Sequence, residues 1–401
     1  MRLMALYPSR REEGHMGTTI CGASAFRFWR VPPVVLLLAT DPDATQILQG
    51  ALDQTSIEQL QLELVTNSPF AIACSHGPSW RTAGEDSRRI REAMPLFAPW
   101  AQLPVDLLVR NHRDCHSSSL VHPSLWSAEL PFGSTTPLAE DIDVTTPAFT
   151  MLQLAGQVDL IHLVLLGSEL CGSFSVYRSP SCIAKALQTL IDRGRLPVID
   201  GWRPSLSNGR LTDLWMRPPL IQPTDLEAIA ANSDSRRGCR KLAQAAKLIN
   251  PNAASPFEVQ AGLLLGLPRQ YGGEGYLGLS HNEEVRLSKE AQVLTGGSRC
   301  YCDLYWDDGL DIECQSAQHH DNDGSYLSDA DRSGALRLMG IDVLPITYAT
   351  LKDPRRFEAL SHAVAEARNL RPRPKTSKEL EAAAALRDKV LVDWGRLVDQ
   401  G

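Results

Sequence analysis

The chain has 401 residues, of which 43% are apolar and 22% charged, and its formal net charge at pH 7 is −7. This composition is typical of globular proteins, and the length exceeds what one hydrophobic core usually organises, so we expect two or three domains. The negative charge argues against a protein that coats nucleic acid through its overall charge, although a local basic patch is compatible with it.

Residues 1–16 are expected to form an extension ahead of the folded chain. They carry charges where a signal peptide needs an apolar core, and the apolar run at 31–40 is far too short to span a bilayer. The nine cysteines are scattered and odd in number, which favours reduced thiols over a disulfide framework. We therefore expect a cytoplasmic protein with no membrane partner.

Residues 17–175 are predicted to form an N-terminal α/β domain. Apolar positions near helical spacing predict a short helix that ends before Pro32 and Pro33, because proline cannot continue a helix. The segments that follow alternate between short apolar runs and amphipathic stretches, which favours an α/β arrangement. They predict strands at 34–40, 69–75 and 103–109, and helices at 43–52 and 56–64.

Histidines in this first part of the chain are interpreted as structural. His162 lies within a predicted pair of buried helices that follows a turn at 145–147, and we expect it to be a core residue. Zinc ligands are suggested by His112, Cys115, His116 and His122. No Cys-x-x-Cys pair accompanies them, so a polar loop is the interpretation that we favour.

Residues 176–250 are predicted to connect the two halves and to include a basic helix. Its positive side chains are Arg236, Arg237, Arg240, Lys241 and Lys247. Such a run is usually a solvated helix face, and the functional alternative is a surface that contacts nucleic-acid phosphates.

Residues 251–370 are predicted to form a second α/β domain, followed by a linker and a C-terminal helix at 371–401. Ser255, Pro256 and Glu258 form a helix start in which the serine caps and the glutamate closes a capping box. Thr376 and Glu379 open the last helix in the same way.

A β-hairpin is predicted between Cys300 and Gln315. Two alternating runs flank Asp307-Asp308-Gly309, and a glycine commonly ends a three-residue hairpin loop. This loop places Trp306 opposite Leu310, Leu304 opposite Ile312 and Cys302 opposite Cys314, which makes one face apolar.

The polar face of the same hairpin places Asp303 opposite Glu313, together with Tyr301, Tyr305, Asp311 and Gln315. Cross-strand Cβ atoms lie roughly 4.5–5.5 Å apart, so two carboxylates could share a divalent cation such as Mg²⁺, which would promote hydrolysis of a phosphodiester. The alternative is an ordinary solvated face, since antiparallel hairpins carry acidic residues there routinely.

The order of SPFE, CDLYW, IECQSAQHH and DADRSGALRLMGIDVLPITYATL resembles the Vsr-like endonuclease branch of the PD-(D/E)XK superfamily. The chain is also similar to actinobacterial proteins that join such a domain to an N-terminal region like that of AbiEi-family antitoxins, through CGASAFRFWRVPP and VTTPAFTMLQLA. The resemblance implies an N-terminal mixed α/β region and a restriction-endonuclease-like C-terminal α/β domain with a mixed sheet.

The resemblance also implies roles for individual residues. Glu258 would be the helix carboxylate, Asp303 and Glu313 the metal ligands, and His319 the histidine after the second strand, with Asp329 and Arg332 opening the next helix. Gln315 stands where the family has Asp and the wider superfamily Lys, and Ser333 replaces a usual Asp. Because an amide cannot act as that lysine does, water activation would fall to the metal or to His319.

Two function classes follow. The first is a Mg²⁺-dependent DNA endonuclease of a defence or toxin–antitoxin type, with Mn²⁺ as a substitute and Glu258, Asp303, Glu313, Gln315 and His319 as its site. The second is a regulator without catalysis, which uses the same fold as a scaffold and binds DNA through the basic run or binds a protein partner. A zinc site of Cys300, Cys302, Cys314, His319 and His320 is a weaker alternative, because Cys302 and Cys314 are expected on the apolar face.

Overall fold

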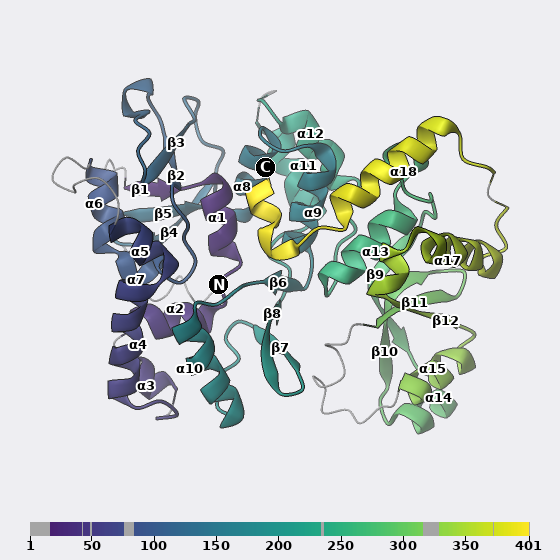
Figure 1. The fold of residues 1–401 in the computed structure, drawn as a ribbon. Helices are drawn as coiled ribbons and strands as arrows, with labels where there is room; N and C mark the ends of the chain where they lie inside the picture. Colours follow the sequence, from purple (N-terminus) through teal and green to yellow (C-terminus); the bar gives the residue numbers. More distant parts are fainter. Residues whose placement is uncertain are drawn as a thin grey trace.

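The computed structural model describes residues 17–41, 43–48, 50–75, 84–233, 236–315, 329–371 and 373–400. The predicted α/β class is confirmed, since helices surround three β-sheets (Figure 1). The predicted extension at 1–16 lies outside the described residues. No helix among the described residues is long and apolar enough to cross a membrane.

The first sheet has five strands in the order β3-β2-β1-β5-β4 and mixes parallel with antiparallel pairs. Its strands are β1 (Thr18–Ile20), β2 (Val105–Val109), β3 (Val121–Leu125), β4 (Thr135–Ala139) and β5 (Ile142–Thr145). Helix α1 (Gly22–Trp29) follows β1 and ends before Pro32, as predicted. Asp106 of β2 accepts hydrogen bonds from the backbone and hydroxyl of Ser24, so it ties the start of α1 to the sheet.

Two segments predicted as strands are helices, α2 (Pro33–Thr40) and α5 (Pro69–Ser75). All of α2 except Thr40 is buried, and a short apolar run does not distinguish a buried strand from a helix that is buried on every side. In α5, the Ser68 hydroxyl accepts the Ala71 amide and Pro69 follows the cap, which is a helix start that the prediction missed.

The other N-terminal helices pack around α2 and α5. They are α3 (Ala44–Ile47), α4 (Gln54–Asn67), α6 (Glu85–Glu92) and α7 (Met94–Phe97), with a 3-10 turn at His112–Asp114. Residue range 43–52 was predicted to be helical throughout, but α3 covers only its first part. Together with β1, β2 and β5, α2, α4, α5 and α7 bury an apolar cluster that we call the N-terminal core.

The middle of the chain contributes helices and a small antiparallel sheet. The predicted buried pair is present as α8 (Pro147–Ala155) and α9 (Leu160–Cys171), and the sheet has the order β6-β8-β7. The remaining elements are β6 (Phe174–Val176), α10 (Ser181–Asp192), β7 (Arg203–Ser207), β8 (Arg210–Met216), α11 (Pro223–Ala231) and α12 (Cys239–Ala246). His162 is only partly buried, and its Nε2 lies 2.6 Å from the carbonyl oxygen of Leu397.

The C-terminal sheet has the order β12-β11-β10-β9 and is mixed, as predicted. Strands β9, β10 and β11 are antiparallel neighbours, and β12 pairs with β11 in parallel after a crossover through α15. The elements are α13 (Pro256–Gly266), β9 (Leu279–Arg286), α14 (Lys289–Thr295), β10 (Arg299–Trp306), β11 (Leu310–Gln315), α15 (Asp329–Leu338), β12 (Asp342–Thr347), α16 (Tyr348–Lys352) and α17 (Pro354–Ala367). A short 3-10 turn, η4 (Arg269–Tyr271), follows α13.

The end of the chain returns to its beginning. Helix α18 (Ser377–Val390) packs on α13, and the 3-10 turn η6 (Trp394–Gln400) lies beside α1 and α9 in the centre of the molecule (Figure 1). One apolar cluster, the shared core, contains Phe26 of α1, Leu304 of β10 and Leu397 of η6. This core crosses the boundaries predicted near residues 175, 250 and 370, which stay predictions.

Candidate functional site

Glu258 lies at the start of α13 and is 3% exposed. Its carboxylate accepts hydrogen bonds from the Ala254 amide at 2.7 Å, the Ser255 hydroxyl at 2.9 Å and Asn282 Nδ2 at 2.8 Å. The Ser255 hydroxyl in turn accepts the Glu258 amide, as predicted, but Glu258 accepts the Ala254 amide rather than the Ser255 amide that the predicted capping box requires. Glu258 therefore joins the first turn of α13 to β9.

The predicted hairpin register is confirmed where the two strands pair. Trp306 is opposite Leu310 and Leu304 opposite Ile312, and Gly309 has the predicted left-handed conformation, with a φ of 90°. Both pairs lie in the shared core. The hairpin therefore presents these apolar residues to the centre of the molecule.

The strands separate at Asp303, and the prediction that Cys302 faces the same side as Cys314 is wrong. Asp303 accepts the backbone amide of Cys314 with its side chain at 2.8 Å, and Asn282 on β9, opposite Asp303, has a positive φ of 49°. Cys314 belongs to the shared core, whereas Cys302 packs with Ala335 and other residues in a separate cluster under α14 and α15. All nine cysteines are free thiols.

Asp311 is the largest departure from the predicted polar face, because it is completely buried. Its ladder neighbours Tyr305 and Val343 pack against Ala335 and Leu336 of α15, so this side of the sheet is covered. The Asp311 carboxylate interacts with the Glu313 carboxyl and the Cys302 thiol, whose hydrogen bonds lower its pKa, but neither interaction among the described residues has good hydrogen-bond geometry. A buried polar group in this state calls for a specific explanation.

Glu313 is held by the helix that follows the hairpin. Arg332 of α15 donates from Nη2 to the Glu313 carboxylate at 2.7 Å, and the same nitrogen also donates to the carbonyl oxygen of Tyr301. The Arg332 side chain is 32% exposed and the Glu313 side chain 17%. Arg332 therefore fixes Glu313 against both strands of the hairpin.

The carboxyl groups are close enough to repel one another. Burial raises the pKa of Glu258 to about 8, and the charge of Asp303 adds to the rise. Burial raises the pKa of Glu313 as well, reinforced by Asp303 and Asp311 and opposed by Arg332. The pKa of Asp311 is raised by burial and by Asp303. We call these four residues the carboxylate cluster: Arg332 offsets the charge of Asp303, Asp311 and Glu313, and Glu258 lies beside Asp303.

The remaining predicted site residues make no described contact with the carboxylate cluster or lie outside the described residues. Gln315 is exposed at the end of β11, opposite Thr347 of β12. His319, the predicted proton acceptor, and His320 lie outside the described residues. Asp329 begins α15.

His281 of β9 was not identified from the sequence. It is 5% exposed, and burial lowers its pKa to about 4, so the neutral imidazole is favoured. It packs so closely on α13 that a Cβ at Gly262 would lie 2.6 Å from its Cε1 atom. Its position opposite Leu304 in the β9–β10 pair, next to Asp303, places it beside the carboxylate cluster.

Within the described residues, no group of three or more His, Cys, Asp or Glu side chains is arranged to hold a metal ion. The donor chemistry nevertheless suits Mg²⁺, which prefers carboxylate oxygens. Asp311 contributes two buried oxygens with only poorly aligned contacts to Glu313 and Cys302, and Glu313 would have to exchange its ion pair with Arg332 for the metal. The residues present therefore fit Mg²⁺ by chemistry, with Glu313 as the side chain that has to move.

The predicted basic helix is present as α12, but it begins after Arg236 and Arg237. Arg236, Arg237, Arg240 and Lys247 are exposed, whereas Lys241 donates its Nζ to the carbonyl oxygen of Val158. Arg236 also lies over the ring of Trp126, at 5.8 Å from its centroid. Helix α12 and the carboxylate cluster lie in separate parts of the molecule (Figure 1).

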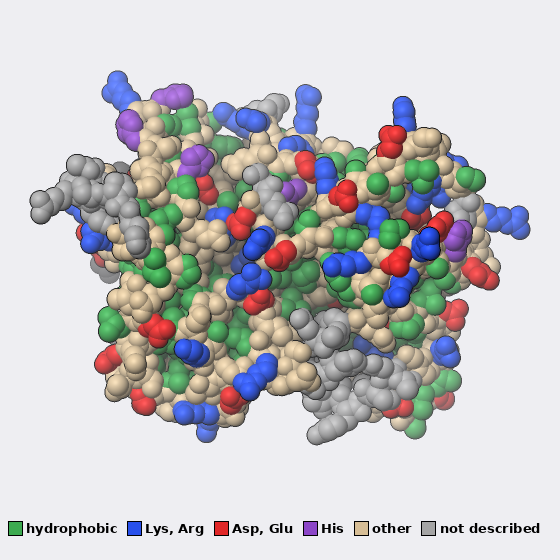
Figure 2. Space-filling model, viewed as in Figure 1, with side chains coloured by type: hydrophobic (Ala, Val, Ile, Leu, Met, Phe, Trp, Pro, Cys, Tyr) green, Lys and Arg blue, Asp and Glu red, His purple; other side chains and the backbone are tan. Residues whose placement is uncertain are grey.

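The face of the molecule seen in Figure 2 is mixed in charge. Figure 2 shows Lys and Arg interspersed with Asp and Glu over this face, rather than gathered into one broad basic region. Any contact with phosphates would therefore rest on a few arginines, as the net charge of −7 already suggests.

Comparisons with models of known protein families, with curated proteins and with solved structures found no match.

Proposed function

We propose that the C-terminal half of the chain is a Mg²⁺-dependent phosphodiester hydrolase that acts on DNA. The observation that carries the proposal is the grouping of Asp303, Asp311 and Glu313, in which the fully buried Asp311 carboxylate has only the Glu313 carboxyl and the Cys302 thiol as poorly aligned partners among the described residues. Burying uncompensated charge is costly, and a bound cation is a common reason for tolerating it.

The order of elements supports the proposal. Glu258 lies on the helix before the sheet, Asp303 on β10 and Glu313 on β11, and Arg332 lies on the helix that crosses to β12. This is the order implied by the resemblance to the Vsr-like endonucleases. The mixed four-stranded sheet with its parallel last pair supports it further.

Each residue then has a role in the proposed site. Asp303, Asp311 and Glu313 would hold Mg²⁺, which supplies polarisation of a phosphoryl oxygen and a more acidic bound water. Glu258 would position the start of α13 beside Asp303 through its three hydrogen bonds. Arg332, once released from Glu313, would bind a phosphate oxygen through its planar guanidinium. Gln315 would orient the substrate by hydrogen bonding.

The proposal is tested with plasmid DNA in the presence of Mg²⁺ or Mn²⁺. The wild type is expected to nick the DNA, and Glu313→Gln to lose at least about 100-fold in rate, because metal stabilisation of the transition state is worth several kcal/mol. Glu284→Gln on the neighbouring strand β9 is the matched control and should retain activity, since the exposed Glu284 side chain pairs with Arg299 and the Tyr301 hydroxyl and not with a carboxyl group of the cluster. Equal nicking by wild type and Glu313→Gln would contradict the proposal.

The second candidate is a regulator that binds DNA without cleaving it, and the exposure of Arg236, Arg237 and Arg240 favours it. Fluorescence anisotropy with a labelled duplex distinguishes the two. If these arginines contact phosphates, their triple alanine variant should lower the slope of log affinity against log salt by about 3, since each phosphate contact contributes about 0.9. Asp303→Ala should leave binding unchanged.

An Arg355→Ala/Arg356→Ala variant on α17 is the control for the loss of positive charge elsewhere. An unchanged salt slope in the triple alanine variant would argue against this surface. If neither half binds DNA at low salt, a protein partner becomes the better interpretation of the regulatory alternative.

A further inference from the structure

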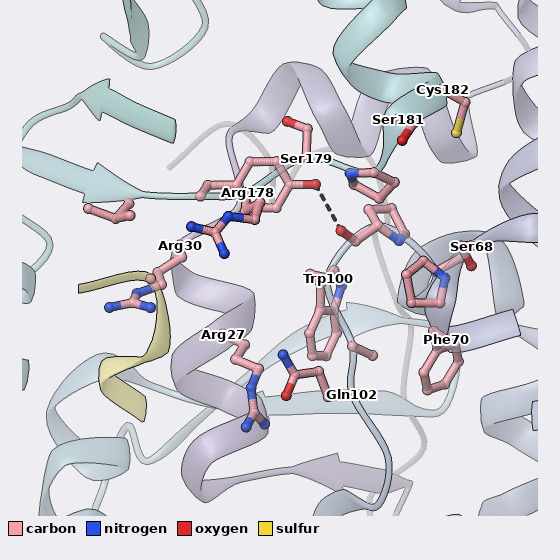
Figure 3. Close-up of a pocket in the computed structure, with 18 of the residues that line it drawn as sticks. Arg27, Arg30, Ser68, Phe70, Trp100, Gln102, Arg178, Ser179, Ser181 and Cys182 are labelled. Atoms are coloured by element: carbon pink, nitrogen blue, oxygen red, sulfur yellow. Dashed lines mark hydrogen bonds between the residues drawn. The ribbon is translucent and has the colours of Figure 1, made fainter. Parts of the chain in front are cut away.

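A cavity of about 540 Å³ lies between the N-terminal elements and the end of the chain. Its walls come from α1, the start of α5, the loop at 98–102, the start of α10 and the η6 turn. Figure 3 shows Arg27, Arg30 and Arg178 along one side and Ser68 and Phe70 on the other. The volume is in the range of small-molecule sites, which are commonly formed where separate parts of a protein meet.

Arginine is prominent among the lining residues. Arg27, Arg30, Arg178 and Arg396 line the cavity, whereas its acidic residues are Glu63 and Asp399. In a chain with a net charge of −7, this is a local reversal of charge. Arg30 donates hydrogen bonds from Nε and Nη2 to the Glu169 carboxylate, so the other three arginines remain for a ligand.

Two of these three arginines, Arg178 and Arg396, have carboxylate partners that an anion could replace. Arg178 pairs with Asp213 at 3.0 Å and Arg396 with Asp393 at 3.8 Å, and all four side chains are at least 47% exposed. Exposed ion pairs in water are weak, so a phosphate group competes well with them. Neither pair closes the cavity to a ligand.

Arg27 is paired in a different way. Its Nη2 donates to Asp399 of η6 at 2.5 Å, and its buried Nε has no partner among the described residues. The Asp399 carboxylate therefore lies where the anionic group of a ligand would lie. The η6 turn that carries it forms one wall of the cavity.

The start of α10 adds to the positive character of the cavity. This helix has 12 residues, its N-cap is Pro180, which has no side chain to accept the first amides, and its first turn contains no acidic residue. Pro180, Ser181 and Cys182 line the cavity (Figure 3). Amide groups at a helix start and the helix dipole both favour a bound anion, here beside Arg178.

We propose that this cavity binds a small organic phosphate of about the size of a nucleotide. The phosphate contacts Arg178 and the start of α10, and it replaces Asp399 at Arg27. The apolar residues Phe70, Pro99 and Val398 of the lining receive the organic part. The site is independent of the carboxylate cluster and does not rest on the proposed nuclease activity.

Isothermal titration calorimetry with the full chain, without added metal, tests the proposal with ATP, AMP and inorganic pyrophosphate as probes. Arg178→Ala is expected to weaken nucleotide binding at least tenfold, and Arg178→Lys to recover part of it, since a charge-assisted hydrogen bond to phosphate is lost. Asp399→Asn is expected to tighten binding, because it removes the competing carboxylate. This gain distinguishes a direct role of the cavity from general damage to the fold.

Arg203→Ala on the exposed surface of β7 is the matched control and should bind as the wild type does. Tighter binding of ATP or AMP than of pyrophosphate supports an organic phosphate. Equal affinity for pyrophosphate would overturn the organic part of the proposal. The site itself would be overturned if no probe binds at millimolar concentration. It would also be overturned if Arg178→Ala and Asp399→Asn both bind the probes with the affinity of the wild type.

Discussion

Replacement of Glu169 by alanine is expected to lower the free energy of unfolding by about 3–5 kcal/mol, the range for breaking a buried ion pair from one side. Glu169 of α9 has no exposed surface, and its carboxylate accepts from Arg30 of α1, the Val176 amide and Trp394 Nε1 of η6. The alanine variant leaves Arg30, which is 5% exposed, without its counter-charge. The effect is therefore the cost of an uncompensated buried cation.

Chemical denaturation followed by tryptophan fluorescence measures this change. Arg88→Ala is the control, since Arg88 is 66% exposed and pairs only at 3.8–4.0 Å, and it should change stability by at most about 1 kcal/mol. An Arg30→Met/Glu169→Ala double variant should be more stable than Glu169→Ala alone, because it removes the orphaned charge. A loss below about 1 kcal/mol in Glu169→Ala would contradict this account of the centre of the molecule.

Without metal, the protein is expected to lose stability as the pH rises from about 6.5 to 8, by roughly 2 kcal/mol from Glu258 at about 1.4 kcal/mol per pKa unit. The folded pKa of Glu258 is about 8 and its ordinary value 4.5, so between these values the folded protein holds a proton that the unfolded chain has released. The stabilisation is complete below pH 4.5 and is lost as the pH rises through about 8. Glu313 acts in the same direction.

His281 gives the opposite slope at lower pH. Its folded pKa of about 4 lies below the ordinary 6.5, so stability falls as the pH drops from 6.5 towards 4. The two slopes oppose each other between pH 4.5 and 6.5, and only the carboxyl groups act above that range. The decline at higher pH is therefore the informative measurement.

Thermal unfolding across this pH range, with and without millimolar Mg²⁺, tests the prediction. Mg²⁺ should reduce the decline, because a ligand of the folded state stabilises it, and Glu258→Gln should reduce it without metal. Glu284→Gln, which alters an exposed carboxylate on β9, should keep the decline of the wild type. If the stability of the wild type does not change above pH 6.5, the pKa values of Glu258 and Glu313 are not raised in the folded protein, and the prediction is wrong.

Local rules predicted much of the C-terminal half. The hairpin register followed from alternation and from Gly309, and the helix start at Ser255 followed from side-chain capping; both depend on residues a few positions apart. The helix pair α8 and α9 was also predicted from local sequence, namely the turn at 145–147 and the apolar positions that follow it. By contrast, the uniformly apolar segment that forms α2 has no periodicity, so its buried helix was taken for a strand.

The departures within the site depend on contacts between distant segments. Asp311 is buried because α15 covers its side of the sheet, and Cys302 changes side because Asp303 accepts a backbone amide where the two strands separate. The burial of Asp311 and the side of the sheet that Cys302 faces cannot be derived from the spacing of residues along one strand. His281 was missed for the same reason, since its burial comes from the close approach of α13 at Gly262.

The return of η6 to the middle of the molecule has a consequence for how the chain folds during its synthesis. Arg30 and Glu169 are both translated long before Trp394, which stands 364 positions after Arg30 and supplies a hydrogen bond to each. Until that turn leaves the ribosome, the buried ion pair remains open to water on one side. Early folding of the N-terminal half is therefore expected to leave this ion pair partly hydrated until η6 packs against it.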